Sequence, residues 1–515
     1  MKAFLVLLLL LPTVCPALAE TPKNELVIAL EDNPPHFNPV LLSGSLVGSI
    51  GAQLFAGLTR LSPEGDPRPY FASCWTHSRD YRTFTFSLRE GFFHDGTPIT
   101  ASDVAFSIMA SRDNHPFGPM LEPVEAVETP DAHTAVVRLS RPFPALPAVL
   151  IPSLVPILPR HVFGDGRPLD AQEANLAPVG SGPFMLEAFV PNRYVRLVRN
   201  PRFFLPGKPL LDRVTFRIYW DQAEIPLALS SGEADVYLFS SPLILDAFRQ
   251  NYPFRSVRIT PIPNLHAYLV LDCNLEAAPL DDPRVRKALS LALDRNALAR
   301  LFGMAEPQYG PIPPGAPYHA PLMEPFDPEL AGRLLDEAGY PRGQNGKRFT
   351  LVLDYTPGTD FFPPVVGLLR HEFARLGIEI VPRDSMQFSE WMRHVSTGAF
   401  QVSLDELFAW HDPVVGIHRL YSARNARSNI PWANMGKYAN PHAERFMSDA
   451  SSETDPGKRR ELYAAFQRVV AEDHPMLWLA TMPYGLLSLP PVRHLDTLGL
   501  GTLSPLDGID KEGRP

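Results

Sequence analysis

Hydrophobic and polar positions along the chain repeat with two different periods. Apolar residues alternate with polar ones over 83–88, 194–199 and 214–218, which predicts half-buried strands. Apolar residues recur at helical spacing over 280–298 and 326–340, and an aspartate followed by a proline opens each run, which predicts capped amphipathic helices. Strands interspersed with helices indicate an α/β protein.

The second half of the chain continues this pattern. A strand at 350–353, a helix at 364–376 and a strand at 378–381 predict a βαβ-like unit. The remaining elements are expected as a strand that runs into a loop at 399–413, a helix at 458–472 and a last strand at 477–480.

The segment 178–235 has the strongest punctuation in the chain. Pro178, Gly180, Gly182 and Pro183 fall within six residues. Taken alone, these residues predict a turn before a hairpin. The strands described above follow, then a short helix at 223–231 and a strand that begins near 235.

The N-terminus has the pattern of an export signal. Lys2 is followed by an apolar run at 3–11 that is well short of the ~20 residues a membrane-spanning helix needs. Ala17-Leu18-Ala19 is a small-x-small cleavage site. Cys15 suggests a lipoprotein as the alternative, but residues 12–14 lack the small residue expected before it. We therefore expect cleavage after Ala19 and export to the periplasm as a soluble protein.

Length and composition narrow the class of protein. A chain of 515 residues suggests about three domains. Its 45% hydrophobic and 20% charged residues are typical of a globular protein, and a formal net charge of -9 without a basic block argues against nucleic acid as a partner. Beyond the signal, two cysteines remain, Cys74 and Cys273. A disulfide is possible in an exported protein, but we favour two buried small side chains, because the cysteines fall in segments assigned to different lobes.

Motifs of catalysis and metal binding are missing from the sequence. It contains no G-x-S-x-G elbow, no Walker loop and no H-E-x-x-H motif; His371-Glu372 begins such a motif, but position 375 is Arg. His411 and His418 are seven residues apart, which we interpret as solvated or core histidines. The sequence therefore predicts a binding protein and not an enzyme, without catalytic residues, metal site or cofactor.

Eight segments, taken in order, resemble the solute-binding proteins of ABC importers, family 5, the group of peptide, nickel and opine binders. They are LFAGLTRLSPEGDPRPYFASCW, LREGFFHDGTPITASDVAFSI, PVGSGPFMLEAF, RNPRFF, SSGEADV, PLDDPRVRKALSLALDR, FDPELAGRLLDEAGY and WHDP. The resemblance covers nearly all of the mature chain. It implies a two-lobed, class II periplasmic binding protein-like α/β fold with an additional third domain, in which the lobes close over the ligand.

The resemblance also implies a division of the chain. Lobe I would combine 20–62, 177–268 and 481–515. The extra domain II would span 63–176, and lobe III would span 269–480. The segment 178–235 is central because there the chain re-enters lobe I.

Peptide binders of the family hold an extended peptide by backbone pairing and clamp its two charged ends. An aspartate before the Asp-Pro pair holds the peptide amine; the matching position here is Ala409. An arginine after the strand of the βαβ unit holds the carboxylate in short-peptide binders; an ungapped count places Thr356 there. Both charges are absent, so we expect zwitterionic dipeptides to bind poorly by that clamp.

Two acidic residues and one tryptophan stand out near the clamp. We expect Asp405 and Glu406 at a strand end that faces the cleft, where one of them would supply an anion for a cationic group of the ligand. A solvated acidic pair is the alternative. Trp410 is a candidate for ligand stacking or a core residue.

The resemblance predicts a periplasmic substrate-binding protein of an ABC importer that binds peptides or peptide-like solutes and delivers them to an inner-membrane permease. It is expected to be a monomer. The alternatives are an exported hydrolase, a chaperone or sensor on the same fold, or a carrier of an opine, a glycoside or a nickel complex. The predicted ligand-binding residues are Ser43, Gly44, Ser45, Tyr237, Asn264, Asp405, Glu406, Trp410, His411 and Asp412.

Overall fold

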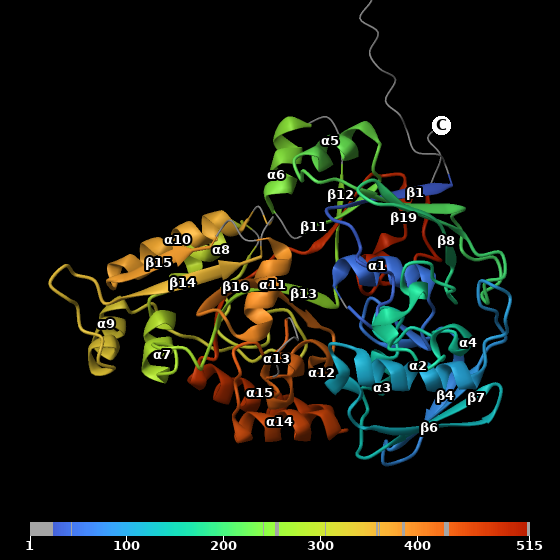
Figure 1. Ribbon diagram of the computed structural model, residues 1–515, viewed down its shortest axis with the longest axis horizontal. Helices are drawn as coiled ribbons and strands as arrows, with labels where there is room; N and C mark the ends of the chain where they lie inside the picture. The colour runs from blue at the N-terminus through green and yellow to red at the C-terminus, as the bar shows by residue number, and fades with distance from the viewer. Residues whose placement is uncertain are drawn as a thin grey trace, which may run out of the picture.

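Three large sheets organise the protein (Figure 1). The computed structural model describes residues 24–42, 44–239, 242–252, 257–303, 305–356, 359, 361–383, 387–426 and 432–511. The predicted signal peptide at 1–19 and Ser43 lie outside the described residues. In the view of Figure 1, the five-stranded sheet lies on the left, the seven-stranded sheet at the upper right and the four-stranded sheet at the lower right.

The seven-stranded sheet combines strands from three separate parts of the chain, in the order β12-β18-β11-β1-β10-β9-β8. β1 pairs in parallel with β10 and β11, whereas β8, β9 and β10 form an antiparallel meander. The alternation at 194–199 and 214–218 correctly predicted β9 and β10. The strands are β1 (Glu25–Leu30), β8 (Phe184–Val190), β9 (Tyr194–Arg199), β10 (Arg213–Ile218), β11 (Val236–Phe239), β12 (Arg258–Pro261) and β18 (Gly485–Ser488).

Helices cover both faces of this sheet. On one face, α5 (Glu224–Ser231) and α6 (Pro242–Asn251) bury Ile225, Leu229 and Phe248 against Val27 and Ala29 of β1. On the other face, α1 (Ser45–Leu54) packs into the largest apolar core, which also includes Leu26 and Ile28. The alternating side chains of β1 thus serve two cores.

The Gly/Pro turn at 178–183 packs against the C-terminal end of α1. Gly182 N–H donates to the carbonyl of Leu54 (2.9 Å), and His94 N–H donates to the carbonyl of Gly180 (2.9 Å). A Cβ on Gly180 would lie 1.9 Å from the Leu54 carbonyl oxygen. Glycine is required because the two backbones touch, and the motif is a packing element between α1 and β8 rather than only a turn.

Replacing Gly180 by alanine should therefore lower the free energy of unfolding by about 1–3 kcal/mol, because backbone must shift to admit the methyl group. Gly367→Ala is the matched control, since no atom lies within 4 Å of a Cβ built there and the residue is inside a helix. Urea unfolding of the wild type and the two variants measures the change in the free energy of unfolding that each substitution causes. Equal midpoints for Gly180→Ala and the wild type would contradict this interpretation of the motif.

The four-stranded sheet is antiparallel, in the order β4-β5-β7-β6. β5 is the strand predicted from the alternation at 83–88. The helix α2 packs on β6 and β7. The elements of this region are β2 (Thr59–Leu61), β3 (Pro67–Pro69), β4 (Ala72–His77), β5 (Thr83–Leu88), α2 (Ala101–Asn114), η1 (Gly118–Leu121), β6 (Val124–Asp131), β7 (Thr134–Leu139), α3 (Leu146–Val149), α4 (Arg160–Phe163), η2 (Leu169–Ala171) and η3 (Glu173–Asn175).

The five-stranded sheet has the order β15-β14-β16-β13-β17, with separate apolar cores on its two faces. β14, α10 and β15 form the predicted βαβ unit, because β14 and β15 pair in parallel. The strands are β13 (Leu265–Cys273), β14 (Phe349–Tyr355), β15 (Ile378–Pro382), β16 (Val402–Trp410) and β17 (Met476–Thr481). The helices are α7 (Pro283–Leu291), α8 (Arg295–Leu301), α9 (Pro328–Glu337), α10 (Phe362–Arg375), α11 (Phe388–Thr397), α12 (Pro413–Gly416), α13 (His418–Tyr421), η4 (Ala423–Asn425), α14 (Pro441–Ser452) and α15 (Pro456–Asp473).

Two sequence predictions for this half need correction. The periodic run at 280–298 forms two helices, since Asp294 accepts from the N–H of Ala297 (3.0 Å) and starts α8 after a break. The strand β17 is not the last one: β18 follows it and pairs with β11 and β12 in the seven-stranded sheet. The chain therefore passes between the five- and seven-stranded sheets at 262–264 and again at 482–484.

The two cysteines are both free, and their surroundings differ. Cys273 is buried, and burial raises its thiol pKa to about 12. Cys74 is exposed on β4, so the prediction of two buried cysteines is wrong for this residue.

Candidate functional site

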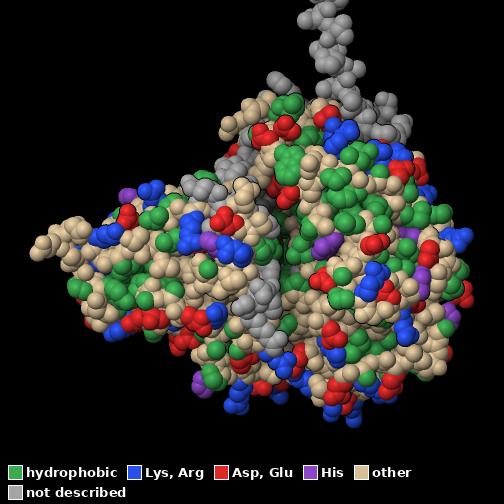
Figure 2. Space-filling model, viewed as in Figure 1, with side chains coloured by type: hydrophobic (Ala, Val, Ile, Leu, Met, Phe, Trp, Pro, Cys, Tyr) green, Lys and Arg blue, Asp and Glu red, His purple; other side chains and the backbone are tan. Residues whose placement is uncertain are grey.

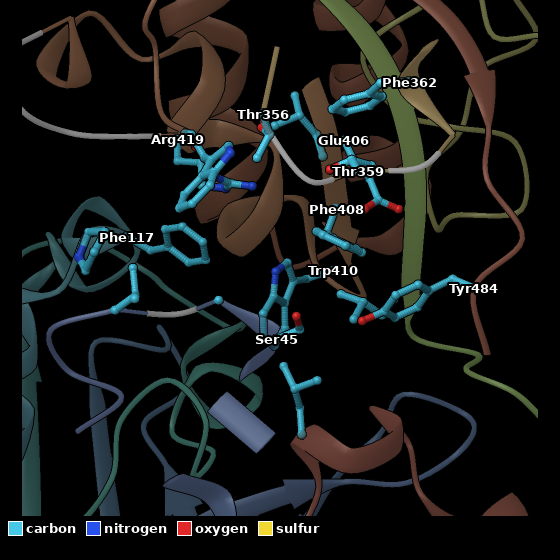
Figure 3. Close-up of a pocket in the computed structure, with 17 residues that line it drawn as sticks. Ser45, Phe117, Thr356, Thr359, Phe362, Glu406, Phe408, Trp410, Arg419 and Tyr484 are labelled. Atoms are coloured by element: carbon cyan, nitrogen blue, oxygen red, sulfur yellow. The ribbon is translucent and has the colours of Figure 1, made fainter. Parts of the chain in front are cut away.

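A cavity of about 210 Å³ lies between the regions of the three large sheets. Figure 2 shows a narrow furrow on the face of the molecule where the part with the five-stranded sheet adjoins the rest. The start of α1, the loop before η1 and the open end of the five-stranded sheet all contribute side chains. The lining residues are Leu42, Gly44, Ser45, Pro116, Phe117, Leu265, Thr356, Thr359, Phe362, Glu406, Leu407, Phe408, Trp410, Arg419, Trp432, Tyr484 and Leu503 (Figure 3).

The strand β16 presents an open edge at the cavity. β13 pairs with β16 along its whole length, from Val402 to Trp410. On its other side, β14 pairs only with Val402, Ser403 and Leu404. Among the described residues, the backbone from 405 to 410 therefore has no strand partner on the β14 side. A strand edge of this kind can add an extended ligand by backbone pairing. At its far end α12 covers this edge, since a Cβ on Gly416 would lie 2.9 Å from the Phe408 carbonyl oxygen and 2.6 Å from the Trp410 nitrogen.

Aromatic rings from separate parts of the chain form the walls. Phe117 and Trp410 meet edge to face with ring centroids 6.5 Å apart, and Phe408 meets Tyr484 at 5.0 Å. Phe117 comes from the region of the four-stranded sheet, whereas Tyr484 lies in the connection between β17 and β18. In Figure 3 these four rings extend across the view, from Phe117 on the left through Trp410 and Phe408 to Tyr484 on the right. Convergent apolar walls of this kind are typical of small-molecule sites.

Two charged side chains, Glu406 and Arg419, complete the lining. Figure 3 places them on different sides of the open space. Burial, together with the charges of Glu406 and Glu31, raises the pKa of the Tyr484 phenol well above its usual value, so that Tyr484 stays neutral. The site combines one carboxylate, one guanidinium and a neutral phenol within an aromatic enclosure.

The structure brings four of the predicted ligand-binding residues to the cavity. Gly44 and Ser45 come from the start of α1, and Glu406 and Trp410 come from β16. Trp410 is 5% exposed and belongs to the large core, so it serves both the cavity wall and the core.

Tyr237 and Asn264 do not line the cavity. Tyr237 is buried on the α5–α6 side of the seven-stranded sheet, and its hydroxyl donates to Glu31. The Asn264 amide donates to the carbonyls of Ser62 (2.9 Å) and Gly499 (3.0 Å) at the crossing between the sheets. These contacts indicate structural roles for both residues.

His411 and Asp412 also lie away from the cavity lining. The carboxylate of Asp412 accepts from Val414 N–H (3.0 Å) at the start of α12 and binds Arg459 through both oxygens (2.8 and 2.9 Å). Burial raises the pKa of Asp412, but Arg459 reverses this effect and leaves the pKa below its usual value. The His411 ring lies against Gly65, where it would meet any Cβ.

The predicted position of Asp405 is wrong. This residue is fully buried inside β16 rather than at a strand end facing the cleft. Neither carboxylate oxygen makes a hydrogen bond of good geometry with a described residue. Burial and the neighbouring Asp354 raise the pKa of Asp405 to about 7, offset only in part by the nearby Ser403 hydroxyl.

The two positions matched to the peptide clamps have different surroundings. Thr356 lines the cavity, whereas Ala409 is buried and does not. Sequence reasoning missed the cation of the site, Arg419, and the rings of Phe117 and Tyr484. The signal for Arg419 was present, because it is a lone arginine in the run from Val414 to Tyr421 that follows the Asp-Pro pair, a run that is apolar apart from Arg419 and His418.

The fold and the cavity between its lobes define a ligand-binding protein of the periplasmic binding protein type. The model of the bacterial extracellular solute-binding proteins, family 5, matches residues 66–428. The chain belongs to this family. Proteins of the family are extracellular or periplasmic, bind small-molecule or peptide ligands and work with an ABC permease.

Similar proteins carry different solutes. The glutathione-binding protein GsiB of Escherichia coli (strain K12) is 26% identical over 477 residues, which cover 90% of each chain. The oligopeptide-binding protein AppA of Bacillus subtilis, solved with a nonapeptide, has a TM-score of 0.84 at 20% identity and covers 96% of this chain and 100% of its own. NikZ of Campylobacter jejuni, solved with Ni(L-His), has a TM-score of 0.82 at 22% identity and covers 94% of this chain and 98% of its own. These structures establish the fold.

None of the helices among the described residues is long and apolar enough to cross a membrane. Within the same part of the chain, no group of three or more His, Cys, Asp or Glu side chains is placed to hold a metal ion.

Proposed function

We propose that this protein is the solute-capturing component of an ABC importer for peptides or peptide-like solutes, and that it acts as a monomer without catalysing a reaction. The solute would occupy the cavity along the open edge of β16 and leave it unchanged. The observation that carries this proposal is the convergence of all three sheet regions on one aromatic cavity, beside the part of β16 that β14 does not pair with among the described residues. The names of the relatives add support, since glutathione and oligopeptides share a peptide backbone.

The proposal includes the division of the chain and its export. Lobe I would contain 20–62, 177–268 and 481–515, domain II would contain 63–176 and lobe III would contain 269–480. The three large sheets agree with these units, with the first residues of β13 as the main difference. Cleavage after Ala19 would release the protein into the periplasm. The net charge of -9 argues against nucleic acid as a partner.

Native mass spectrometry of protein purified from periplasm tests the proposal. We expect a peptide-like small molecule to dissociate from the protein on activation and to keep its mass when it is returned to the protein and incubated. Recovery of a hydrolysed or otherwise altered compound would support an exported hydrolase and contradict the proposal.

Glu406 is proposed to bind a cationic group of the solute, such as a free amine. The expected role of Asp405 is not retained, because that residue does not line the cavity. Dipeptides and their N-acetylated forms measure this contact. We expect Glu406→Gln to weaken binding of the free-amine forms tenfold or more, because hydrogen bonds to charged groups contribute about 1.5–3 kcal/mol, and to leave the acetylated forms nearly unaffected.

Asp405→Asn is the matched control, since it removes a neighbouring carboxylate outside the cavity lining. Wild-type affinity of Glu406→Gln for the free-amine forms would refute the role of Glu406.

A further inference from the structure

Arg419 is a buried cation that forms no ion pair with any of the described residues. The residue is 4% exposed, yet it lines the cavity. No carboxylate oxygen of the described residues lies within 4.0 Å of its guanidinium. An uncompensated buried charge costs several kcal/mol, so a protein that retains one has a use for it.

The carboxyl group of Asp272 does not neutralise this charge. Asp272, on β13, interacts with Arg419 only at longer range. Burial and the charge of Asp405 raise the pKa of Asp272 well above its usual value, which reduces the negative charge that it offers to Arg419. The guanidinium therefore faces the cavity with most of its charge.

The guanidinium is held in position by neutral groups. Its Nε donates to the carbonyl of Gly416 (3.1 Å), and its Nη1 donates to the carbonyl of Trp432. The ring of Phe117 lies 4.3 Å from the guanidinium carbon. None of the described residues accepts a hydrogen bond from Nη2. Two carbonyls and one ring thus orient the group and leave donors for a ligand.

The remaining lining indicates which anion fits. Glu406 also lines the cavity, so a doubly charged group such as a phosphate dianion would meet repulsion that a single carboxylate avoids. The aromatic walls and the cavity of about 210 Å³ favour a small apolar body next to the charge. The position of the short-peptide carboxylate clamp is occupied by Thr356, which carries no charge.

We propose that Arg419 anchors the carboxylate of a small monocarboxylic solute with an apolar or aromatic body, such as the C-terminal group of a dipeptide or of an N-acylated amino acid. This inference rests on the proposed function and adds the substrate class. Because Phe117 stacks on Arg419 from the region of the four-stranded sheet, the carboxylate would bind next to a contact that joins two regions of the protein.

Matched acids and amides test the anchor. The probes are N-acetyl-phenylalanine, N-acetyl-leucine and the dipeptides Ala-Phe and Ala-Leu, each as free acid and as carboxamide, titrated calorimetrically. For every acid that the wild type binds, we expect a dissociation constant at least tenfold lower than that of the matching amide. Arg419→Gln should abolish this preference, whereas Arg419→Lys should keep part of it, because charge remains and the planar fork does not.

The control is Arg424→Gln, which removes an exposed arginine that pairs with Glu122 (2.9 Å) and does not line this cavity. It should keep the preference. The comparison of acid and amide on the wild type does not depend on the folding of any variant. If amides bind the wild type as tightly as acids, the anchor is refuted while the proposed function stands. If no probe of either series binds, the inferred substrate class is refuted, while the proposed function is decided separately by the solute that co-purifies with the protein.

Discussion

Asp412→Asn is expected to lower the free energy of unfolding by about 3–5 kcal/mol, because it leaves Arg459 buried without its counter-ion. Both side chains of this pair are 9% exposed, and two hydrogen bonds of 2.8 and 2.9 Å connect them. Asparagine can still cap α12, so the loss reports the ion pair rather than the cap. Urea unfolding at pH 7 measures the effect.

Asp449→Asn is the matched control, because it breaks the exposed pair with Arg445 (3.5 Å), where the exposed fractions are 49% and 79%. Its cost should stay below about 0.5 kcal/mol. The pKa of Asp412 is lower in the folded protein, so its contribution is present above the unfolded pKa and is lost as pH falls through the folded pKa. The difference in the free energy of unfolding between the wild type and Asp412→Asn should therefore become smaller at acidic pH. Similar losses for Asp412→Asn and Asp449→Asn would contradict a structural ion pair at Asp412.

Asp405→Asn is expected to change the free energy of unfolding in the opposite direction from Asp412→Asn. It should stabilise the protein at pH 8 by about 1–3 kcal/mol. The pKa of Asp405 is about 7 in the folded protein, mainly because of burial, against about 3.9 in an unfolded chain. A raised folded pKa means that stability is fully present below the unfolded pKa and is lost as pH rises through about 7. Asparagine carries no charge, so the variant should lose this pH dependence and should match the wild type near pH 4.

Unfolding temperatures of the wild type and Asp405→Asn between pH 4 and pH 8 measure this difference in pH dependence. Asp235→Asn provides the contrast, because Asp235 is also buried but accepts from Val27 N–H (2.9 Å) and pairs with Lys511 (2.9 Å). That variant should be destabilised at pH 8. A lower unfolding temperature for Asp405→Asn at pH 8 would show that the carboxylate has a stabilising partner.

Most of the fold follows from local patterns. Alternation identified β5, β9 and β10, and capped amphipathic runs identified α7 and α9, because each pattern reports burial of one face. The break between α7 and α8 was missed, since the apolar positions continue through it while Asp294 starts a new helix. The return of the chain through β18 depends on pairing with β11 and β12, which no local pattern encodes.

The candidate site was predictable only in part, for a similar reason. Glu406 and Trp410 lie on one strand whose motif could be recognised, and the resemblance to family 5 placed them near the ligand. Phe117, Arg419 and Tyr484 come from three distant segments and meet only after the lobes pack together. Asp405 was misplaced because periodicity does not tell how far a strand continues between its neighbours.

Small-angle scattering with and without a bound solute tests the central claim most directly, with the solute that co-purifies with the protein or the tightest binder among the probe acids. If the cavity lies between lobes that close on a solute, the radius of gyration of the solute-free protein should fall on addition of saturating solute, and the solute should be recovered unaltered. An identical scattering profile with and without bound solute would contradict the account.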